Sequence, residues 1–196
     1  MGDSMSSVII SGDTSGAITL SAPAVAGTNT ITLPASTGTV LTTGSPQSGA
    51  VVQTVGATYA TAVSITSVNP TWASVGLTAT ITPKFSTSKI AVFVTGVCGI
   101  AGGSSSLFFT IFRGSTNLGN VTGASSPYFL NRNYSAASGG SSGRTVSMNY
   151  FDSPATTSAT AYTVYCCVDS GTGYFNRIDA AADVGMSQII LMEIAV

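Results

Sequence analysis

Charge is the property that this sequence most lacks. Only 7% of its 196 residues are charged, whereas roughly a quarter are charged in an average soluble domain. No residue from Thr14 to Pro83 carries a charge; the segment is rich in Thr, Ser, Ala, Gly and Val. A surface so poor in charge is weakly protected against association. We therefore expect much of it to be buried between subunits.

Histidine is absent, and Glu193 is the only glutamate. Without histidine, the common Ser-His-Asp triads and His-containing metal centres cannot form. An acid pair for glycoside cleavage would come from Asp152, Asp169, Asp179 and Asp183. Asp152 and Asp169 precede Ser-Pro and Ser-Gly, and aspartates in such turns are mostly structural. We expect a protein that is not an enzyme, with no catalytic residue, no metal site and no cofactor.

Basic clusters and long apolar runs are also missing. The six Lys and Arg residues are scattered, which argues against nucleic acid as a partner. Residues 1–7 lack the basic and apolar regions of a signal peptide. The most apolar stretch, residues 90–101, is too short to cross a bilayer, so we expect no membrane insertion.

Cysteine occurs only at positions 98, 166 and 167. An odd number without a secretory signal argues against a disulfide framework. Cys166 and Cys167 are adjacent in a strand pattern and would point to opposite faces. We expect all three thiols to be free and buried.

Threonine, valine and glycine abound, which favours strands and turns over helices. Near the start, short alternating runs separated by Gly and Asn predict strands at 8–10, 17–20, 30–34 and 39–42. A few such strands cannot form a stable core alone. They need partners, most simply the same segment of other chains; a disordered linker is the alternative.

Residues 42–49, TTGSPQSG, mark a domain boundary near Ser45-Pro46. We assign residues 1–48 to an attachment or stalk segment and residues 49–196 to a jelly-roll-like β-sandwich head, with Trp72 in its interior. The short, even spacing of strands and turns is typical of this all-β architecture. Strands are predicted at 51–55, 62–67, 76–82, 88–98, 106–113, 116–121, 144–152, 159–168, 173–178 and 187–195.

Several of these strands are apolar on both faces. A sheet with one face in water should be polar on that face, so the surplus apolar residues indicate a subunit interface. The last strand is expected to lie near an oligomer axis. The candidate interface residues are Phe93, Val97, Phe108, Phe112, Ile190, Met192 and Ile194.

Two aromatic clusters are candidates for binding, one in the turn-rich segment 123–143 and one near residue 174. Long loops in compact domains are usually functional or mobile, and aromatic rings beside amide and guanidinium donors suit a glycan. Packing between subunits, or at the end of the sandwich, is the alternative. The candidate receptor-binding residues are Tyr128, Phe129, Asn131, Arg132, Tyr134, Tyr174 and Arg177.

Several segments resemble bacteriophage tail-fibre-like virion proteins. GDTSGAITLSAPAVAGTNTITLPASTGTVLTT (12–43) resembles a segment near the start of such proteins; TATITPKFSTSKIAVFVTGV (78–97), FTIFRGSTNLG (109–119) and SQIILMEIAV (187–196) resemble their compact heads. The resemblance implies a homotrimer with a jelly-roll head, assembled in the host cytoplasm and located in the virion.

This resemblance also implies partners. Residues 1–48 would bind other virion proteins of the tail, baseplate or capsid, and the head would bind the host surface, for example a glycan. The first hypothesis is therefore a tail fibre. The second is a capsid decoration or head fibre, and the third is a polysaccharide depolymerase, which the small size and scarce carboxylates disfavour.

Overall fold

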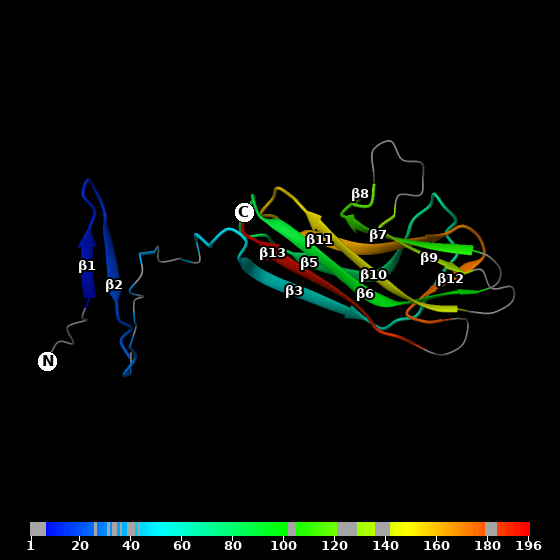
Figure 1. The fold of residues 1–196 in the computed structure, drawn as a ribbon, viewed down its shortest axis with the longest axis horizontal. Helices are drawn as coiled ribbons and strands as arrows, with labels where there is room; N and C mark the ends of the chain where they lie inside the picture. The colour runs from blue at the N-terminus through cyan, green and yellow to red at the C-terminus, as the bar shows by residue number, and fades with distance from the viewer. Residues whose placement is uncertain are drawn as a thin grey trace. The chain divides into compact units, whose positions relative to one another are not determined.

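The computed structural model consists of two compact units, Met1–Val40 and Leu41–Val196. All regular elements in the described residues are β-strands, as Figure 1 shows, which confirms the predicted all-β class. The division between the units precedes the boundary expected near Ser45-Pro46. The structure describes residues 7–25, 27–30, 32, 35, 37–38, 42, 44–101, 105–120, 129–135, 142–178 and 184–196.

The first unit contains an antiparallel hairpin of β1 (Ser7–Ser11) and β2 (Ala17–Ser21). The Gly12 N–H donates a 3.0 Å hydrogen bond to the Gly16 carbonyl. Gly16 has a φ of 79°, a left-handed conformation that glycine adopts without a steric penalty. The strands predicted at 8–10 and 17–20 are confirmed, whereas those at 30–34 and 39–42 include residues that lie outside the described ones.

The second unit contains two antiparallel sheets, consistent with the predicted β-sandwich (Figure 1). The strands of the six-stranded sheet are β3 (Val51–Tyr59), β4 (Val63–Ile65), β6 (Lys89–Ala101), β10 (Ser142–Asp152), β12 (Thr172–Phe175) and β13 (Ser187–Ile194). Those of the five-stranded sheet are β5 (Ala73–Ile81), β7 (Ser105–Arg113), β8 (Thr116–Asn117), β9 (Asn131–Ser135) and β11 (Thr160–Val168).

The pairing order places β6 and β7 inside their sheets. In the six-stranded sheet, β3, β13, β6, β12 and β4 follow one another and β10 pairs with the free side of β6. In the five-stranded sheet, β5, β11 and β7 follow one another, and both β8 and β9 pair with β7.

One apolar core fills the space between the sheets. It draws side chains from both of them, and the rings of Phe109 in β7 and Phe175 in β12 meet with centroids 5.9 Å apart. The alternation that predicted the strands decides which residues enter this core: in β5, Val75 and Leu77 are buried while Thr78 and Thr80 are exposed. The three cysteines are buried and free, as predicted.

One side of the sandwich is formed by β10 from one sheet and by β8 and β9 from the other. In the described part of the chain, β10 pairs only with β6. The Asn131 side chain of β9 donates a 3.2 Å hydrogen bond to the Ser147 carbonyl of β10. This contact holds two strands that belong to different sheets beside each other.

Strand β9 is the element that the sequence did not predict. Its residues, NRNYS, fall in a segment expected to be a long loop. Asn131 pairs with Phe109 and Ser135 with Ser105 along β7. Pairing with the apolar β7, rather than a hydrophobic pattern of its own, makes this segment a strand.

Candidate functional sites

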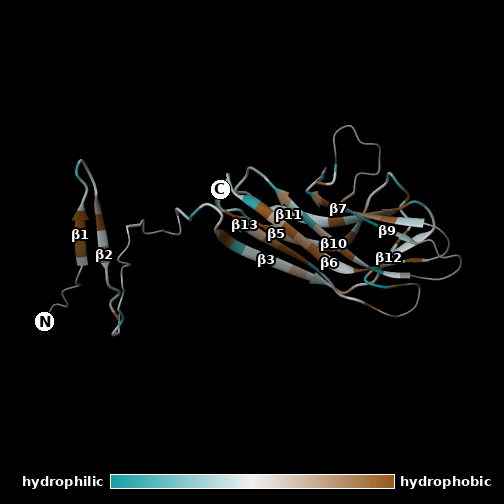
Figure 2. Cartoon of the chain, in the orientation of Figure 1, coloured by the Kyte–Doolittle hydropathy of each residue, from teal (hydrophilic) through white to brown (hydrophobic). Residues whose placement is uncertain are grey.

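One face of the β1–β2 hairpin is aliphatic. Residues directly opposite each other in an antiparallel pair project to the same side, so the pairs Val8–Leu20 and Ile10–Ile18 share a face. These four side chains are 55–66% exposed, and Figure 2 shows the hydrophobic colouring of β1. A lone two-stranded hairpin is marginally stable at best in water. In the described residues this aliphatic face is left uncovered.

The outer face of the six-stranded sheet carries five of the seven predicted interface residues. Ile190 of β13 lies directly opposite Phe93 of β6. Phe93 is exposed, as is Phe151 of β10 on the same face. Val97, Met192 and Ile194 share this face by the strand alternation and are half-buried. These side chains form an apolar surface on the outer face of the sheet, and exposed apolar patches are typical of contact sites.

Phe108 and Phe112, the other two predicted interface residues, lie on the outer face of the five-stranded sheet. Phe108 is only 4% exposed, because the Phe129 ring packs 5.2 Å from it and the Arg132 guanidinium lies 5.6 Å above it. Phe108 therefore offers little surface to another subunit, because its own chain covers it.

Phe112 belongs to an aromatic cluster within the chain. Its ring packs against Tyr165 with centroids 4.2 Å apart and against Trp72 with centroids 6.5 Å apart. All three side chains are half-buried. Trp72 was expected in the sandwich interior, but it packs on the outer face instead.

Arg132 organises one exposed aromatic patch, formed by Phe129, Arg132 and Tyr134. Its guanidinium lies 5.7 Å from the Tyr134 ring centroid, and its Nε and Nη2 donate to the Ser106 hydroxyl at 3.0 and 2.8 Å. Phe129 and Tyr134 are 39% and 49% exposed. The structure thus brings these three predicted receptor-binding residues together.

Two other predicted receptor-binding residues of this segment are placed differently. Asn131 binds the Ser147 carbonyl and accepts a 2.7 Å hydrogen bond from the Asn133 amide. It therefore connects the two sheets rather than facing outward with Tyr134. Tyr128 lies outside the described residues.

The second predicted cluster lies on the other sheet. Tyr174 and Arg177 stack with the guanidinium 4.4 Å from the ring centroid, and Arg177 Nη2 donates to the Ser64 hydroxyl at 2.5 Å. Tyr174 is only 6% exposed, so its ring supports Arg177 and offers little contact surface. The two predicted clusters therefore do not form one site.

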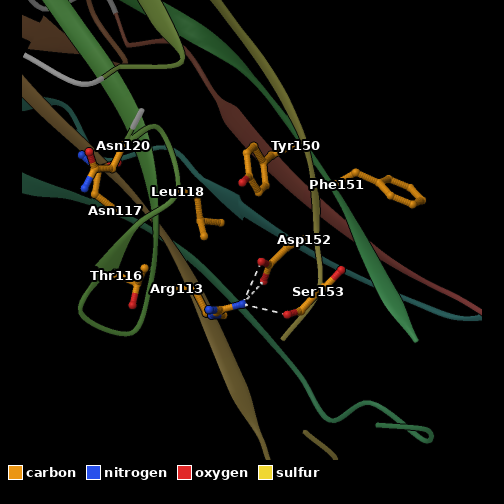
Figure 3. Close-up of a pocket in the computed structure, with 9 residues that line it drawn as sticks. All are labelled: Arg113, Thr116, Asn117, Leu118, Asn120, Tyr150, Phe151, Asp152 and Ser153. Atoms are coloured by element: carbon orange, nitrogen blue, oxygen red, sulfur yellow. Dashed lines mark hydrogen bonds and ion pairs between the residues drawn. The ribbon is translucent and has the colours of Figure 1, made fainter. Parts of the chain in front are cut away.

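A pocket that sequence reasoning missed opens between β8 and β10, on the side of the sandwich that joins the two sheets (Figure 3). Its volume is about 450 Å³, within the range of small-molecule sites. Arg113, residues 116–118, Asn120 and residues 150–153 line it.

A hydrogen-bonded network fixes the charged wall of this pocket. Arg113 Nη1 donates to both oxygens of the Asp152 carboxylate at 2.7 and 2.8 Å and to the Ser153 carbonyl at 3.4 Å. The buried Tyr162 hydroxyl donates to Asp152 Oδ2 at 2.7 Å. Burial, and then the neighbouring Asp152, raise the pKa of Tyr162 far above its ordinary value, so this phenol stays a donor.

Within the described residues, neither a metal cluster nor a membrane-spanning helix is found. No group of three or more His, Cys, Asp or Glu side chains there could hold a metal ion. The same residues include no helix long and apolar enough to cross a membrane. The Asp152 carboxylate forms an ion pair with Arg113 and accepts a hydrogen bond from Tyr162. Its role in these contacts is structural.

No protein-family model matches the sequence, and no curated protein matches it either.

Proposed function

We propose that this chain is a non-enzymatic structural protein of a bacteriophage virion, a short homotrimeric fibre of the tail-fibre type. Residues 1–48 attach it to other virion proteins, and the β-sandwich head faces the host surface. The observation that carries the proposal is the aliphatic face of the β1–β2 hairpin. The resemblance of residues 12–43 to virion proteins supports the same conclusion.

The hairpin argues for assembly because it cannot bury its own apolar face. Its four aliphatic side chains, Val8, Ile10, Ile18 and Leu20, all project to one side. Burying one such side chain contributes roughly 1.5–3 kcal/mol. If three copies of the hairpin turned this face toward a common axis, the four aliphatic side chains of each copy would be buried, and each would contribute to the stability of the trimer. The segment is uncharged beyond Asp13, so the copies do not repel one another there.

The head offers a second surface for the same assembly. Phe93 and Ile190 form an apolar row across β6 and β13, and Phe151 extends the surface to β10. Assembly around this sheet would also place the last strand near the oligomer axis. The Phe129–Arg132–Tyr134 patch lies on the other sheet and would remain free to contact a host glycan.

Sedimentation of the full chain tests the proposal. We expect a species of three times 19.6 kDa for the unaltered protein. The double variant Ile10→Ser/Ile18→Ser removes half of the aliphatic face and should dissociate at low concentration. Ile9→Ser is the matched control, because Ile9 is equally exposed but pairs with Thr19 on the opposite face. A stable monomer of the unaltered chain contradicts the proposal.

Labelling of the head on intact particles tests the location. Signal at the tail supports a tail fibre. Signal over the capsid faces instead assigns the chain to capsid decoration, with the same hairpin serving as the attachment segment.

A further inference from the structure

We propose that the pocket between β8 and β10 binds one uncharged sugar residue. The inference rests on the proposed function in one respect: the sugar would belong to a glycan of the host surface. The site is separate from the Phe129–Arg132–Tyr134 patch, because it opens between the sheets and not on an outer face.

The pocket wall has no net charge that would attract an anion. Among the nine residues that line the pocket, only Arg113 and Asp152 are charged. They form a direct ion pair, so the wall carries no net charge. The Arg113 side chain is 28% exposed and that of Asp152 only 7%, so a ligand meets mainly the guanidinium, whose charge Asp152 already balances. The balanced pair gives an anion no net attraction, and a neutral ligand can still accept hydrogen bonds from the guanidinium.

The polar groups of the pocket suit hydroxyl groups. A guanidinium carries five N–H donors, and Asp152 and Ser153 engage only those on Nη1 of Arg113. Thr116 and Asn120 are exposed at the rim, and the Tyr150 hydroxyl points toward the pocket in Figure 3. Arg113 donates only, whereas the Thr116 and Tyr150 hydroxyls and the Asn120 amide both donate and accept, as do the hydroxyls of a sugar ring.

The pocket also has an apolar surface for the C–H groups of a sugar. The half-buried Tyr150 ring supplies this surface. Leu118 is buried beneath the rim and supports the wall, but it offers little contact surface of its own. Sugar sites combine such surfaces with a few fixed polar groups. Both kinds of surface occur here within a volume of about 450 Å³.

The walls are held in place before any ligand arrives. Arg113 is fixed by Asp152, and Asp152 is fixed in turn by Tyr162. On the β8 side, the Asn117 carbonyl oxygen accepts from the Thr110 hydroxyl at 2.5 Å and from the Gly119 N–H at 2.9 Å. Because these side chains are already ordered, ligand binding costs little of their conformational entropy. A small neutral ligand can therefore bind with few contacts.

The test uses saturation-transfer NMR on the full chain with soluble sugars. The probes are the methyl glycosides of glucose, galactose and mannose, N-acetylglucosamine, and methyl glucuronide as the anionic counterpart. We expect saturable transfer to at least one neutral probe, with a Kd on the order of 1 mM, and at least tenfold weaker binding of the glucuronide.

A pair of tryptophan variants locates the binding. Asn120→Trp fills the pocket mouth without touching the ion pair and should abolish the transfer. Thr157→Trp, at an exposed position outside the pocket, should leave it unchanged. The inference is overturned if no neutral probe shows transfer, if only the glucuronide binds, or if Asn120→Trp binds as well as Thr157→Trp.

The sugar result is independent of the virion proposal. A chain that binds neutral sugar through this pocket but sediments as a monomer refutes the fibre and retains the site. A trimer on the particle that binds none of the sugars retains the fibre and refutes the site.

Discussion

Glu193 of β13 and Gln53 of β3 are direct partners in the antiparallel ladder, and the Gln53 amide donates a 2.5 Å hydrogen bond to the Glu193 carboxylate. Gln53 also donates to the Thr82 carbonyl at 2.7 Å. The other carboxylate oxygen accepts from the Lys84 and Phe85 N–H groups at 2.8 and 3.2 Å. The only glutamate of the chain, fully buried, thus connects both ends of the head sequence to the turn after β5.

Replacing this carboxylate should destabilise the head. Glu193→Gln leaves one carbonyl oxygen where two carboxylate oxygens now accept, and a buried hydrogen bond to a charged group contributes about 1.5–3 kcal/mol. We expect the free energy of unfolding in urea to fall by at least that amount. Asp169→Asn removes the same charge at an exposed position and should have little effect. Equal stability of the two variants would contradict this role of Glu193.

Acid should weaken the same connection. Burial raises the pKa of Glu193, but the hydrogen bonds from the Gln53 amide and from the N–H groups of Phe85 and Lys84 lower it by more, and the net pKa lies below the ordinary value of 4.5. A carboxyl whose pKa is lowered by folding stabilises the fold above its unfolded pKa and loses that contribution as pH falls through the folded one.

Urea unfolding as a function of pH measures this effect. We expect the stability of the unaltered protein to decline below about pH 4.5 and the decline to be shallower in Glu193→Gln. Identical pH profiles for the two proteins would assign acid sensitivity to other groups.

The buried hydroxyl of Tyr162 should contribute to stability through Asp152. Tyr162→Phe removes a 2.7 Å hydrogen bond to a carboxylate that is itself buried, at a cost of about 1.5–3 kcal/mol. Tyr134→Phe removes the same atom from an exposed ring and should change the free energy of unfolding by less than about 0.5 kcal/mol. Thermal unfolding of both variants, compared with the unaltered chain, decides the matter.

Tyr134 should matter for host contact and not for folding. Tyr134→Ala removes an exposed ring beside Arg132, and a loss of about 1.4 kcal/mol in a glycan contact would weaken adsorption roughly tenfold. Particles carrying Thr78→Ala, an exposed change on the outer face of the same sheet, serve as the control. Unchanged adsorption by Tyr134→Ala particles would remove this patch from the host-binding surface.

Local alternation was sufficient to predict most of the strands. In β5, buried and exposed residues alternate almost without exception, so its position and its contribution to the core followed from the sequence. For Phe108 the same argument fails. Its apolar face predicted a subunit contact, yet Phe129 and Arg132, distant in sequence, cover it. A strand pattern identifies an apolar face but not which residues cover it.

The pocket forms only through the tertiary arrangement of strands from both sheets, which no local sequence pattern predicts. Arg113 ends β7, Asp152 ends β10, and the two strands belong to different sheets. Their ion pair becomes predictable only when β8, β9 and β10 are known to meet on one side of the sandwich. The one signal in the sequence was the presence of two opposite charges at strand ends in a chain that is otherwise poor in charge.

Substitutions on the two outer faces of the head should have different effects on assembly. Phe93 on the six-stranded sheet is 43% exposed, so burial between subunits would contribute about 1.5–3 kcal/mol at each interface. Phe93→Ser in the full chain should therefore raise the dissociation constant of the oligomer about 10- to 100-fold and leave the free energy of unfolding of the dissociated chain nearly unchanged.

Phe112 on the five-stranded sheet supplies the contrast, because Tyr165 and Trp72 already cover much of its ring within the chain. Phe112→Ser should lower the free energy of unfolding while the dissociation constant stays nearly constant. Sedimentation equilibrium over a concentration series, together with urea unfolding, separates the two effects. If Phe112→Ser dissociates the oligomer and Phe93→Ser does not, subunits meet through the five-stranded sheet, and the host-facing patch must be sought on the other side.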